Sequence, residues 1–433
     1  MKALSKLICI GCGLERSLAE ETQFLCPKCG DLFDVVPDLS GFKRCLADWA
    51  AIFNSRRQLV RCPSGVWRFR EWIAPGLEES EIVSLGEGNV PIVPAGRNLR
   101  DWIGGDIDLW LMLQGKNPTG AFKDQGMTAW ASVAKALGKR AGVASSTGDT
   151  SASMAAYCAK ASIQCSVCLP DGEVTDEQIL QLKMFGAKVI LLPGDFDACM
   201  AAVLELVERY GAYPANSVNP MRIEGHQSTV FLAAQFFNWQ LPDWFVVPVG
   251  NGSNSSSIGK GLRLMKQLGF PGNSSSILGC QSEAANPMVL SWQRAGELAA
   301  TIEGWEAEYQ PITVGKTIAT AARIGNPVSW KKVIREVIGS NGAMAQASEA
   351  DLTEAALVCS SDGYWVCPQT GQALAGLREA VRKGWIRSKQ RVVVISTADG
   401  GKFGGTYSAI CSGDITRVND CQAKTVAEIL GLA

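Results

Sequence analysis

The chain has 433 residues, of which 47% are hydrophobic and 19% charged, so we expect a well-buried globular protein with more than one core. Its 41 basic residues nearly cancel its 42 acidic residues, which argues against a nucleic-acid or membrane-binding protein. No apolar run approaches the ~20 residues that cross a bilayer, and Met1–Leu14 lacks a signal-peptide core, so a cytoplasmic protein is expected.

Two cysteine pairs open the chain. Cys9 and Cys12 form the first pair, Cys26 and Cys29 form the second, and a glycine follows each pair. This spacing is typical of a zinc ribbon, in which two turns supply four thiolates to one tetrahedral ion. The sequence therefore predicts a zinc-ribbon-like segment over residues 1–40 whose metal is structural. A ribbon that no longer binds metal is the alternative.

A lysine in a tight turn is the most informative feature of the chain. Lys123 lies in the segment Lys116–Gly126, after the apolar run Leu109–Leu113 and before a helical pattern at Met127–Leu137. A lysine on a strand-to-helix turn with small neighbours suits a Schiff base to an aldehyde cofactor. A solvated surface lysine is the alternative, and the remaining motifs decide between the two interpretations.

Short apolar runs alternate with helical patterns from Leu109 onward. The expected strands are Leu109–Leu113, Ala141–Ala144, Ile163–Leu169, Lys188–Leu192, Asp243–Val249 and Arg391–Ser396. The expected helices between them are Met127–Leu137, Ala152–Ala161, Asp176–Phe185, Asp197–Tyr210 and Ile258–Leu268. This rhythm predicts an α/β protein with parallel sheets covered by helices on both faces. Ligands of such sheets bind outside the carboxyl ends of the strands.

A loop rich in serine and glycine follows one of these strands. The motif Pro248–Gly259 follows the strand Phe245–Val249 and opens the helix Ile258–Leu268. Its glycines let backbone N–H groups converge, and the start of the helix adds a positive end, so the loop predicts a phosphate site. Its glycine spacing fits neither a dinucleotide fingerprint nor a P-loop.

Three further motifs carry weaker signals. Ser145–Ser151 follows a strand and suits either a bound carboxylate or simple capping of the next helix. Ser217 and Arg222 are suited to clamp a second phosphate. Thr397 at a strand end is placed to meet a ring nitrogen. His226 is the single histidine of the chain, which argues against a catalytic triad built on histidine and favours a structural role.

Together and in this order, the motifs resemble the threonine synthases of the plant and archaeal or thermophile type, which are pyridoxal-phosphate enzymes with the tryptophan-synthase-β fold. The resemblance covers Leu85–Lys402 and includes the segments Ile318–Trp330 and Cys367–Gly371. It implies fold type II, with two parallel-sheet domains behind the ribbon. The implied domains are the ribbon at 1–40, a large cofactor-binding domain at 41–130 and 225–433, and a small inserted α/β domain at 131–224.

The resemblance also implies a role for each motif. Lys123 is the catalytic residue and holds pyridoxal 5′-phosphate, while Thr397 faces the pyridine nitrogen. The implied cofactor-binding residues are Lys123, Asp149, Gly250, Asn251, Gly252, Ser253, Asn254 and Thr397. The implied substrate-binding residues are Ser146, Thr147, Thr150, Ser217, Arg222 and Asn251. A homodimer is also expected, because dimers are usual in the family.

The implied reaction converts O-phospho-L-homoserine and water to L-threonine and phosphate. The chain departs from the family pattern near the site, at Ala121, Ser253, Gly225–Gln227 and Asp399–Gly401. The alternative is β-replacement or elimination on O-phosphoserine, as in cysteate or cysteine synthases, or on serine or threonine. Ser217 and Arg222 favour a phosphorylated substrate. A ribbon that serves as an adaptor on an inactive core is disfavoured by the balanced charge and the intact Lys123.

Overall fold

The computed structural model describes residues 5–19, 24–39, 44–57, 64–146, 148–171, 176–194, 196–270, 275–411, 415–418 and 422–432, without the side chains of 176–178 and 196–197. The chain divides into two compact units, Met1–Lys402 and Phe403–Ala433. The second unit contains α16 (Gly404–Ile410) and α17 (Ala423–Ile429). The three sheets described below belong to the first unit.

A small antiparallel sheet opens the first unit. Its strands are β1 (Lys6–Cys9), β2 (Glu15–Ser17) and β3 (Phe33–Val36), in the order β2-β1-β3. Leu7, Phe33 and Val35 are buried under it. The sheet brings the two cysteine turns together, because β1 ends at Cys9 and β3 pairs with β1 along its whole length.

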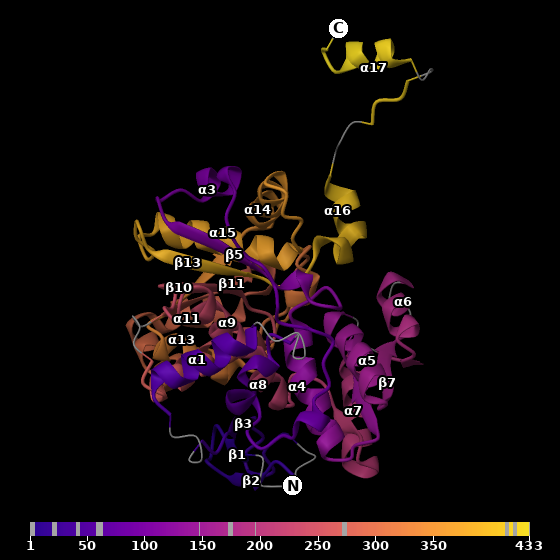
Figure 1. Ribbon diagram of the computed structural model, residues 1–433, viewed down its shortest axis with the longest axis vertical. Helices are drawn as coiled ribbons and strands as arrows, with labels where there is room; N and C mark the ends of the chain where they lie inside the picture. The colour runs from indigo at the N-terminus through magenta and orange to yellow at the C-terminus, as the bar shows by residue number, and fades with distance from the viewer. Residues whose placement is uncertain are drawn as a thin grey trace. The chain divides into compact units, whose positions relative to one another are not determined.

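A six-stranded sheet forms the larger core (Figure 1). Its order is β12-β11-β10-β13-β5-β4, and all neighbours are parallel except β4 with β5. The strands are β4 (Ile92–Pro94), β5 (Asp108–Leu113), β10 (Trp244–Pro248), β11 (Ser276–Ser282), β12 (Ala343–Ala347) and β13 (Arg391–Ser396). The central strands β10 and β13 are continuous apolar runs because helices bury both faces of a parallel sheet.

Helices cover the two faces of this sheet. Figure 1 shows α3, α14 and α15 on one side and α9, α11 and α13 on the other. The helices of this region are α1 (Leu46–Arg57), α2 (Arg70–Ile73), α3 (Arg97–Ile103), α9 (Ser228–Phe236), α10 (Ser253–Gln267), α11 (Pro287–Ala295), α12 (Ile302–Glu308), α13 (Trp330–Gly339), α14 (Glu349–Ser361) and α15 (Pro368–Arg382). Short 3-10 helices lie at Trp67–Phe69, Glu79–Glu81, Gln114–Lys116, Glu283–Ala285, Gly296–Ala300, Thr320–Ala322 and Gly400–Phe403.

A second parallel sheet is built from the middle of the chain. Its strands, in the order β8-β7-β6-β9, are β6 (Ala141–Ala144), β7 (Gln164–Pro170), β8 (Lys188–Leu192) and β9 (Tyr213–Pro214). Helices α5 (Asp149–Ala161), α6 (Asp176–Met184) and α7 (Phe196–Tyr210) accompany it. Side chains alternate between its faces. Cys168 therefore packs in the cluster that contains Cys199 and Val203 of α7, whereas Val167 joins the main core with α5.

Helices α4 (Lys123–Ala136) and α8 (Met221–His226) pack against each other where the two parallel sheets meet. Two glycines allow this close approach. A Cβ on Gly225 would lie 1.9 Å from the backbone oxygen of Gln125, and a Cβ on Gly126 would lie 2.5 Å from Nε2 of His226. The sequence of α4 and α8 therefore brings their backbones together in a way that larger residues would prevent.

The predicted fold class and secondary structure are confirmed. β6, β8 and β13 coincide with the predicted strands, and the other predicted strands are found within one residue at either end. Three helices begin at least three residues earlier than predicted, among them α5, which begins at Asp149 and not at Ala152. α4 begins at Lys123 and not at Met127, and α10 begins at Ser253 and not at Ile258. Lys123 and the first serines of the phosphate loop therefore lie in the first turns of helices.

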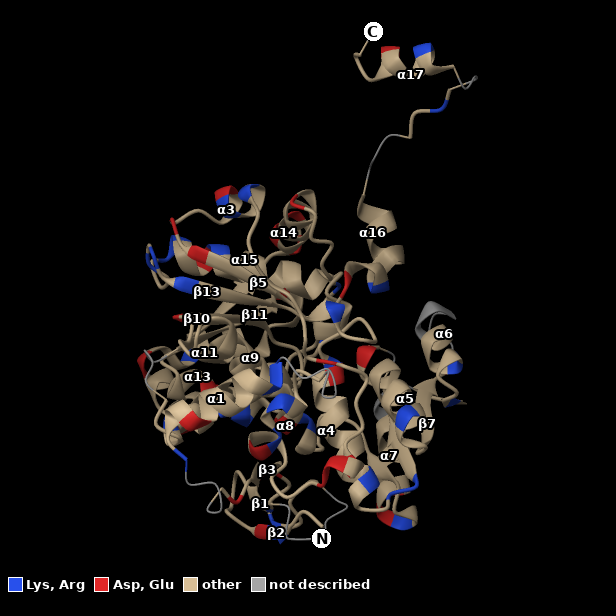
Figure 2. Ribbon diagram, viewed as in Figure 1, with Lys and Arg blue, Asp and Glu red and all other residues tan. Residues whose placement is uncertain are grey.

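Charge is distributed evenly over the first unit. Figure 2 shows acidic and basic residues together on α1, α3 and α7. Among the residues that the structure describes, no helix combines the length and the apolar character that crossing a membrane requires.

Replacing Gly225 with alanine should destabilise the protein by about 1–3 kcal/mol, because the methyl group overpacks the contact between α4 and α8. Gly339→Ala is the matched control, since Gly339 ends helix α13 and a Cβ there meets no atom within 4 Å. Thermal unfolding of both variants measures the difference. Equal melting temperatures for Gly225→Ala and the wild type would contradict the close packing.

Candidate active site

Three of the predicted motifs follow adjacent strands of the six-stranded sheet. The lysine turn follows β5, Thr397 follows β13, and the loop Val249–Gly252 follows β10. β13 pairs in parallel with both β5 and β10. Because the carboxyl ends of parallel strands meet at one edge, these three segments lie side by side where ligands of such sheets bind.

The lysine turn is held against the end of β13 by backbone hydrogen bonds. The N–H of Phe122 donates to the carbonyl of Thr397 at 2.8 Å, and the N–H of Asp399 donates to the carbonyl of Gly120 at 3.0 Å. Gly120 has a φ of +83°, which favours glycine at this bend. These bonds fix the point from which the side chain of Lys123 begins.

Lys123 has a strongly perturbed amine. Burial and, after it, the positive charge of Arg222 lower the pKa of Lys123 to about 7, while the charge of Asp149 opposes the shift. The ammonium nitrogen lies 4.1 Å from the centre of the Phe122 ring. At neutral pH a substantial fraction of this amine is therefore uncharged and able to accept a proton or attack a carbonyl carbon.

The predicted phosphate loop forms the start of α10. Gly252 precedes the helix with a φ of +83°, and a Cβ there would lie 2.5 Å from Cγ2 of Val333. The side chain of Asn254 is buried, and neither its oxygen nor its nitrogen has a hydrogen-bond partner among the described residues. A buried amide without partners beside a helix start is suited to a bound anion.

Thr397 lies at the end of β13 and is 6% exposed. Its hydroxyl is 3.4 Å from the thiol of Cys367, which is also 3.2 Å from the hydroxyl of Thr370. These groups are uncharged at neutral pH, because burial raises the pKa of the Cys367 thiol. A ring nitrogen beside Thr397 would therefore meet a neutral partner.

The two motifs of the four-stranded sheet also come together. β6 and β9 are parallel neighbours, and Ser145 and Asn216 follow them. The amide of Asn216 donates to the carbonyl of Ser145 at 2.8 Å and accepts from its N–H at 3.1 Å. Arg222 donates to the hydroxyl of Thr150 at 3.3 Å. The loop after β6 and the loop after β9 thus form one surface.

Arg222 is a buried cation that has an unused hydrogen-bond donor. It is 1% exposed, and burial lowers its pKa to about 10. One terminal nitrogen donates to the carbonyl of Ala215 at 3.0 Å, but Nε has no partner among the described residues. No carboxylate is paired with Arg222 in the described ion pairs. A guanidinium in this state is suited to bind an anion.

The remaining predicted site residues have more varied positions. Ser146 and Ser217 are partly exposed in the loops after β6 and β9. Asn251 lies in the loop before α10, where its carbonyl accepts from the N–H of Ser329 at 3.0 Å. Asp149 begins α5 and pairs with Lys402 at 3.0 Å. Thr147 lies outside the described residues.

Two residues that we did not predict hold this site together. Asp124 accepts hydrogen bonds from the N–H and the hydroxyl of Thr119 and from the hydroxyl of Ser153 on α5, at 2.5–2.7 Å. Lys402 bonds the carbonyl of Thr119 as well as Asp149. Asp124 belongs to the segment Lys116–Gly126, and Lys402 ends the region that resembles the family, but neither position indicates a partner.

Comparison with known proteins identifies the group to which these features belong. The family described as "Pyridoxal-phosphate dependent enzyme" matches residues 83–398. Threonine synthase 2, chloroplastic, of Arabidopsis thaliana is 36% identical over 382 residues, which are 86% of this chain and 72% of that protein. Threonine synthase of Methanocaldococcus jannaschii is 34% identical over 393 residues, which are 90% of this chain and 91% of that protein.

Solved structures support the same fold. Maize serine racemase superposes with a TM-score of 0.63 at 15% identity, covering 80% of this chain and 95% of that one. O-Acetyl serine sulfhydrylase isoform 3 of Entamoeba histolytica has a TM-score of 0.59 at 19% identity, covering 76% of this chain and 91% of that one. At these identities the likeness concerns the fold alone.

Replacing Lys123 with methionine should stabilise the cofactor-free protein in a pH-dependent way. The pKa of Lys123 is about 7 in the folded protein and about 10.4 in an unfolded chain. Between these pKa values the unfolded chain binds one more proton than the folded protein, so the stability of the folded protein rises with pH. The cost of burying Lys123 is therefore largest below about pH 7. Calorimetry at about pH 6 and about pH 9 should show the larger gain in melting temperature at the lower pH. A gain that is independent of pH would contradict the lowered pKa.

Proposed function

The chain belongs to the family of pyridoxal-phosphate-dependent enzymes, and we propose that it acts as a threonine synthase, a lyase that converts O-phospho-L-homoserine and water to L-threonine and phosphate. The observation that carries this proposal is the convergence of one perturbed amine with two separate anion sites. Lys123 begins helix α4 at the same sheet edge as the loop before α10, and its pKa is lowered by the charge of Arg222. Threonine synthases are also the relatives with which the chain shares most of its length.

The residues at the sheet edge fit the cofactor. A phosphate at the start of α10 would accept from the N–H groups of its first turn and from the unpartnered amide of Asn254. Lys123 would hold the aldehyde carbon, and Thr397 would face the ring nitrogen without protonating it. Bound pyridoxal phosphate supplies an electron-withdrawing ring that makes a proton on the substrate carbon acidic.

The second anion site fits the phosphate of the substrate. We assign it to Arg222, whose Nε is free to donate, with Ser217 and Asn251 as further ligands. Ser146, Thr147 and Thr150 are assigned to the substrate carboxylate at the start of α5, with Asp149 oriented by Lys402 toward the cofactor. An anion beside Arg222 would also offset the mutual repulsion of Arg222 and Lys123.

The amine of Lys123 is proposed to move the protons of the reaction. With its pKa lowered to about 7, the released amine accepts the α proton of the substrate and relays a β proton at neutral pH. Phosphate then leaves from the γ carbon toward Arg222, and the amine returns one proton to the γ carbon. Water adds at the β carbon, and a second proton returns to the α carbon. Burial of the site by α4, α5 and α8 limits the access of bulk water to the earlier steps.

An elimination or replacement enzyme for O-phosphoserine would use the same cofactor and the same guanidinium. The two substrates differ in the carbon that carries the phosphate, so the test is product analysis with each. We expect the purified holoenzyme to release phosphate and form threonine from O-phosphohomoserine. It should release much less phosphate from O-phosphoserine. The opposite preference would overturn the proposal and support the alternative.

Replacing Lys123 with alanine should abolish threonine formation and the visible absorbance of the lysine-bound cofactor, because no other group at the sheet edge supplies the amine in this proposal. Lys135→Ala is the matched control, since Lys135 is an exposed lysine on the same helix. It should retain both the absorbance and the activity. Turnover at the wild-type rate in Lys123→Ala would contradict the assignment.

The division into domains, the oligomeric state and the location of the protein are also proposals. We propose that the six-stranded sheet is the core of a large cofactor-binding domain (41–130 and 225–433) and that the four-stranded sheet is the core of a small one (131–224), behind the ribbon at 1–40. The structure separates 403–433 as a unit of its own. A cytoplasmic homodimer that acts on a small phosphorylated amino acid without nucleic acid completes the proposal.

A further inference from the structure

The two cysteine turns at the start of the chain have the same geometry. The N–H of Gly13 donates to the carbonyl of Cys9 at 3.0 Å, and the N–H of Gly30 donates to the carbonyl of Cys26 at 2.8 Å. Both glycines have positive φ, at +70° and +78°. The N–H groups of Cys9 and Cys26 each donate to the residue five positions later, at 2.9 and 2.8 Å. Two equivalent turns therefore present their thiols to one centre.

The four thiols are spaced as the ligands of one metal ion. The sulfurs of Cys9 and Cys29 are 3.4 Å apart, those of Cys12 and Cys26 are 3.6 Å apart, and all four lie within 4.8 Å of one another. None of the four forms a disulfide. Zinc bonded at about 2.3 Å to four tetrahedral thiolates places the sulfurs about 3.8 Å apart. The cluster therefore matches a closed tetrathiolate site.

We propose that this ribbon binds one structural Zn²⁺ and that the metal-held ribbon acts as a clamp, through β3, on the helices that carry the phosphate loop and Arg222. The metal site stands on the cysteine geometry alone. The clamp rests on the proposed role of the α10 loop in binding the cofactor. Each half has its own test below.

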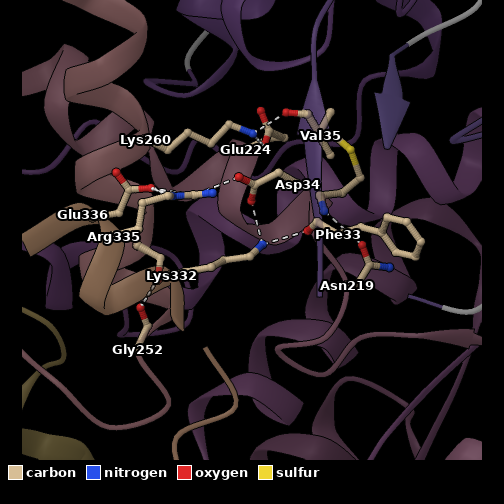
Figure 3. Close-up of polar contacts among 12 residues, drawn as sticks. Phe33, Asp34, Val35, Asn219, Glu224, Gly252, Lys260, Lys332, Arg335 and Glu336 are labelled. Atoms are coloured by element: carbon tan, nitrogen blue, oxygen red, sulfur yellow. Dashed lines mark hydrogen bonds and ion pairs between the residues drawn. The ribbon is translucent and has the colours of Figure 1, made fainter. Parts of the chain in front are cut away.

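β3 is joined to α10 and α13 by three cations, of which Lys332 and Lys260 are buried (Figure 3). Lys332 of α13 donates to the carbonyl of Phe33 at 2.7 Å and pairs with Asp34 at 2.7 Å. Arg335 of α13 pairs with Asp34 at 2.8 Å. Lys260 of α10 donates to the carbonyl of Val35 at 2.6 Å. Three consecutive residues of the ribbon thus provide acceptors for three cations of the core.

Two of these cations take hydrogen-bond partners from the ribbon inside the buried core. Lys332 is 3% exposed and Lys260 is 8% exposed. Removal of one partner from a buried ion pair leaves an uncompensated charge, which is strongly unfavourable. If β3 moved away, Lys332 would lose both Asp34 and the carbonyl of Phe33. The core therefore has a stable arrangement of these helices only while the ribbon is in place.

The same helices carry the proposed anion sites. Ser329, which precedes α13, donates its N–H to the carbonyl of Asn251, and Val333 of α13 packs on Gly252. On the other side, Lys260 forms an ion pair with the fully buried Glu224, two residues after Arg222 on α8. One strand of the ribbon thus contacts the supports of both anion sites.

The metal adds to the packing that holds the ribbon in this position, because the ribbon has little regular structure of its own. Its strands have four, three and four residues, and a segment this small rarely has enough core to remain folded without a metal or disulfides. In such segments the free energy of metal binding becomes free energy of folding. Zinc binding at the cysteines is therefore linked to the order of β3 and, through it, to the phosphate loop.

Metal analysis of the purified holoenzyme tests the site. We expect about one zinc per chain, since a closed tetrathiolate holds one ion, and loss of that zinc in Cys26→Ser. Cys45→Ser is the control, because Cys45 is exposed and outside the cluster, and it should keep its zinc. A wild-type protein without metal, iron in place of zinc, or zinc retained in Cys26→Ser would overturn the metal site.

The clamp is tested without disturbing the cysteines. Asp34→Asn should keep its zinc but bind pyridoxal 5′-phosphate at least about tenfold more weakly, a loss typical of removing a supporting residue behind a binding site. Glu15→Gln is the matched control, because Glu15 forms an exposed pair with Lys6 on the same ribbon. Absorbance titration of each variant with the cofactor measures the affinity. Unchanged affinity in Asp34→Asn would overturn the clamp.

Neither readout requires threonine to be formed. The measured zinc content and cofactor affinity can both agree with the inference even if the enzyme acts on O-phosphoserine. Conversely, the wild-type protein could form threonine while Asp34→Asn binds the cofactor normally. That result would support the proposed activity and overturn only the clamp. Failure of one proposal is thus distinguishable from failure of the other.

Discussion

The contact between α4 and α8 is the constraint on which the rest of the site depends. α4 begins with Lys123 at the edge of the six-stranded sheet, and α8 carries Arg222 from the end of the four-stranded sheet. Gly126 and Gly225 let the two backbones touch. Because the amine and the guanidinium are delivered by different sheets, their separation is set by this helix contact and not by either sheet alone.

Electrostatics explains why the site is suited to anions. The buried charge of Arg222 lowers the pKa of Lys123, burial lowers the pKa of Arg222, and the carboxylate that opposes the shift at Lys123, that of Asp149, is paired with Lys402. The site therefore holds positive charge and unpartnered donors in excess. Such an arrangement is unfavourable by itself and becomes favourable when anionic groups enter. Donors such as Nε of Arg222 and the amide of Asn254 thus lack hydrogen-bond partners in the protein and are available to a bound anion.

The sequence predicted most of the fold and the order of the site motifs, because strands and glycine-rich turns are local patterns. Residues that follow parallel strands could be placed at one edge without knowing any contact. The supports could not be predicted. Asp34 pairs with Lys332, and Asp149 pairs with Lys402, although the partners in both pairs lie far apart in the sequence. No periodicity or motif spacing encodes such pairs, since they arise only when the helices are packed.

The sequence predicts that α4 begins at Met127, later than the observed start at Lys123, for a related reason. The segment before Met127 is rich in turn-forming residues, and its helical conformation from Lys123 is set by hydrogen bonds to Asp124 and to the end of β13. Tertiary contacts thus extended the helix beyond its local signal. The same extension at α10 moved Ser253 and Asn254 from a loop into a helical turn.

The single histidine of the chain has a practical consequence. His226 is fully buried, its ring centre is 4.9 Å from that of Phe122, and burial lowers its pKa well below the usual range. The imidazole therefore stays neutral while Lys123 beside it changes charge. One histidine means one pair of imidazole resonances, so magnetic resonance on the unmodified protein can follow the charge of Lys123 and the closeness of α4 to α8 without any label at the site.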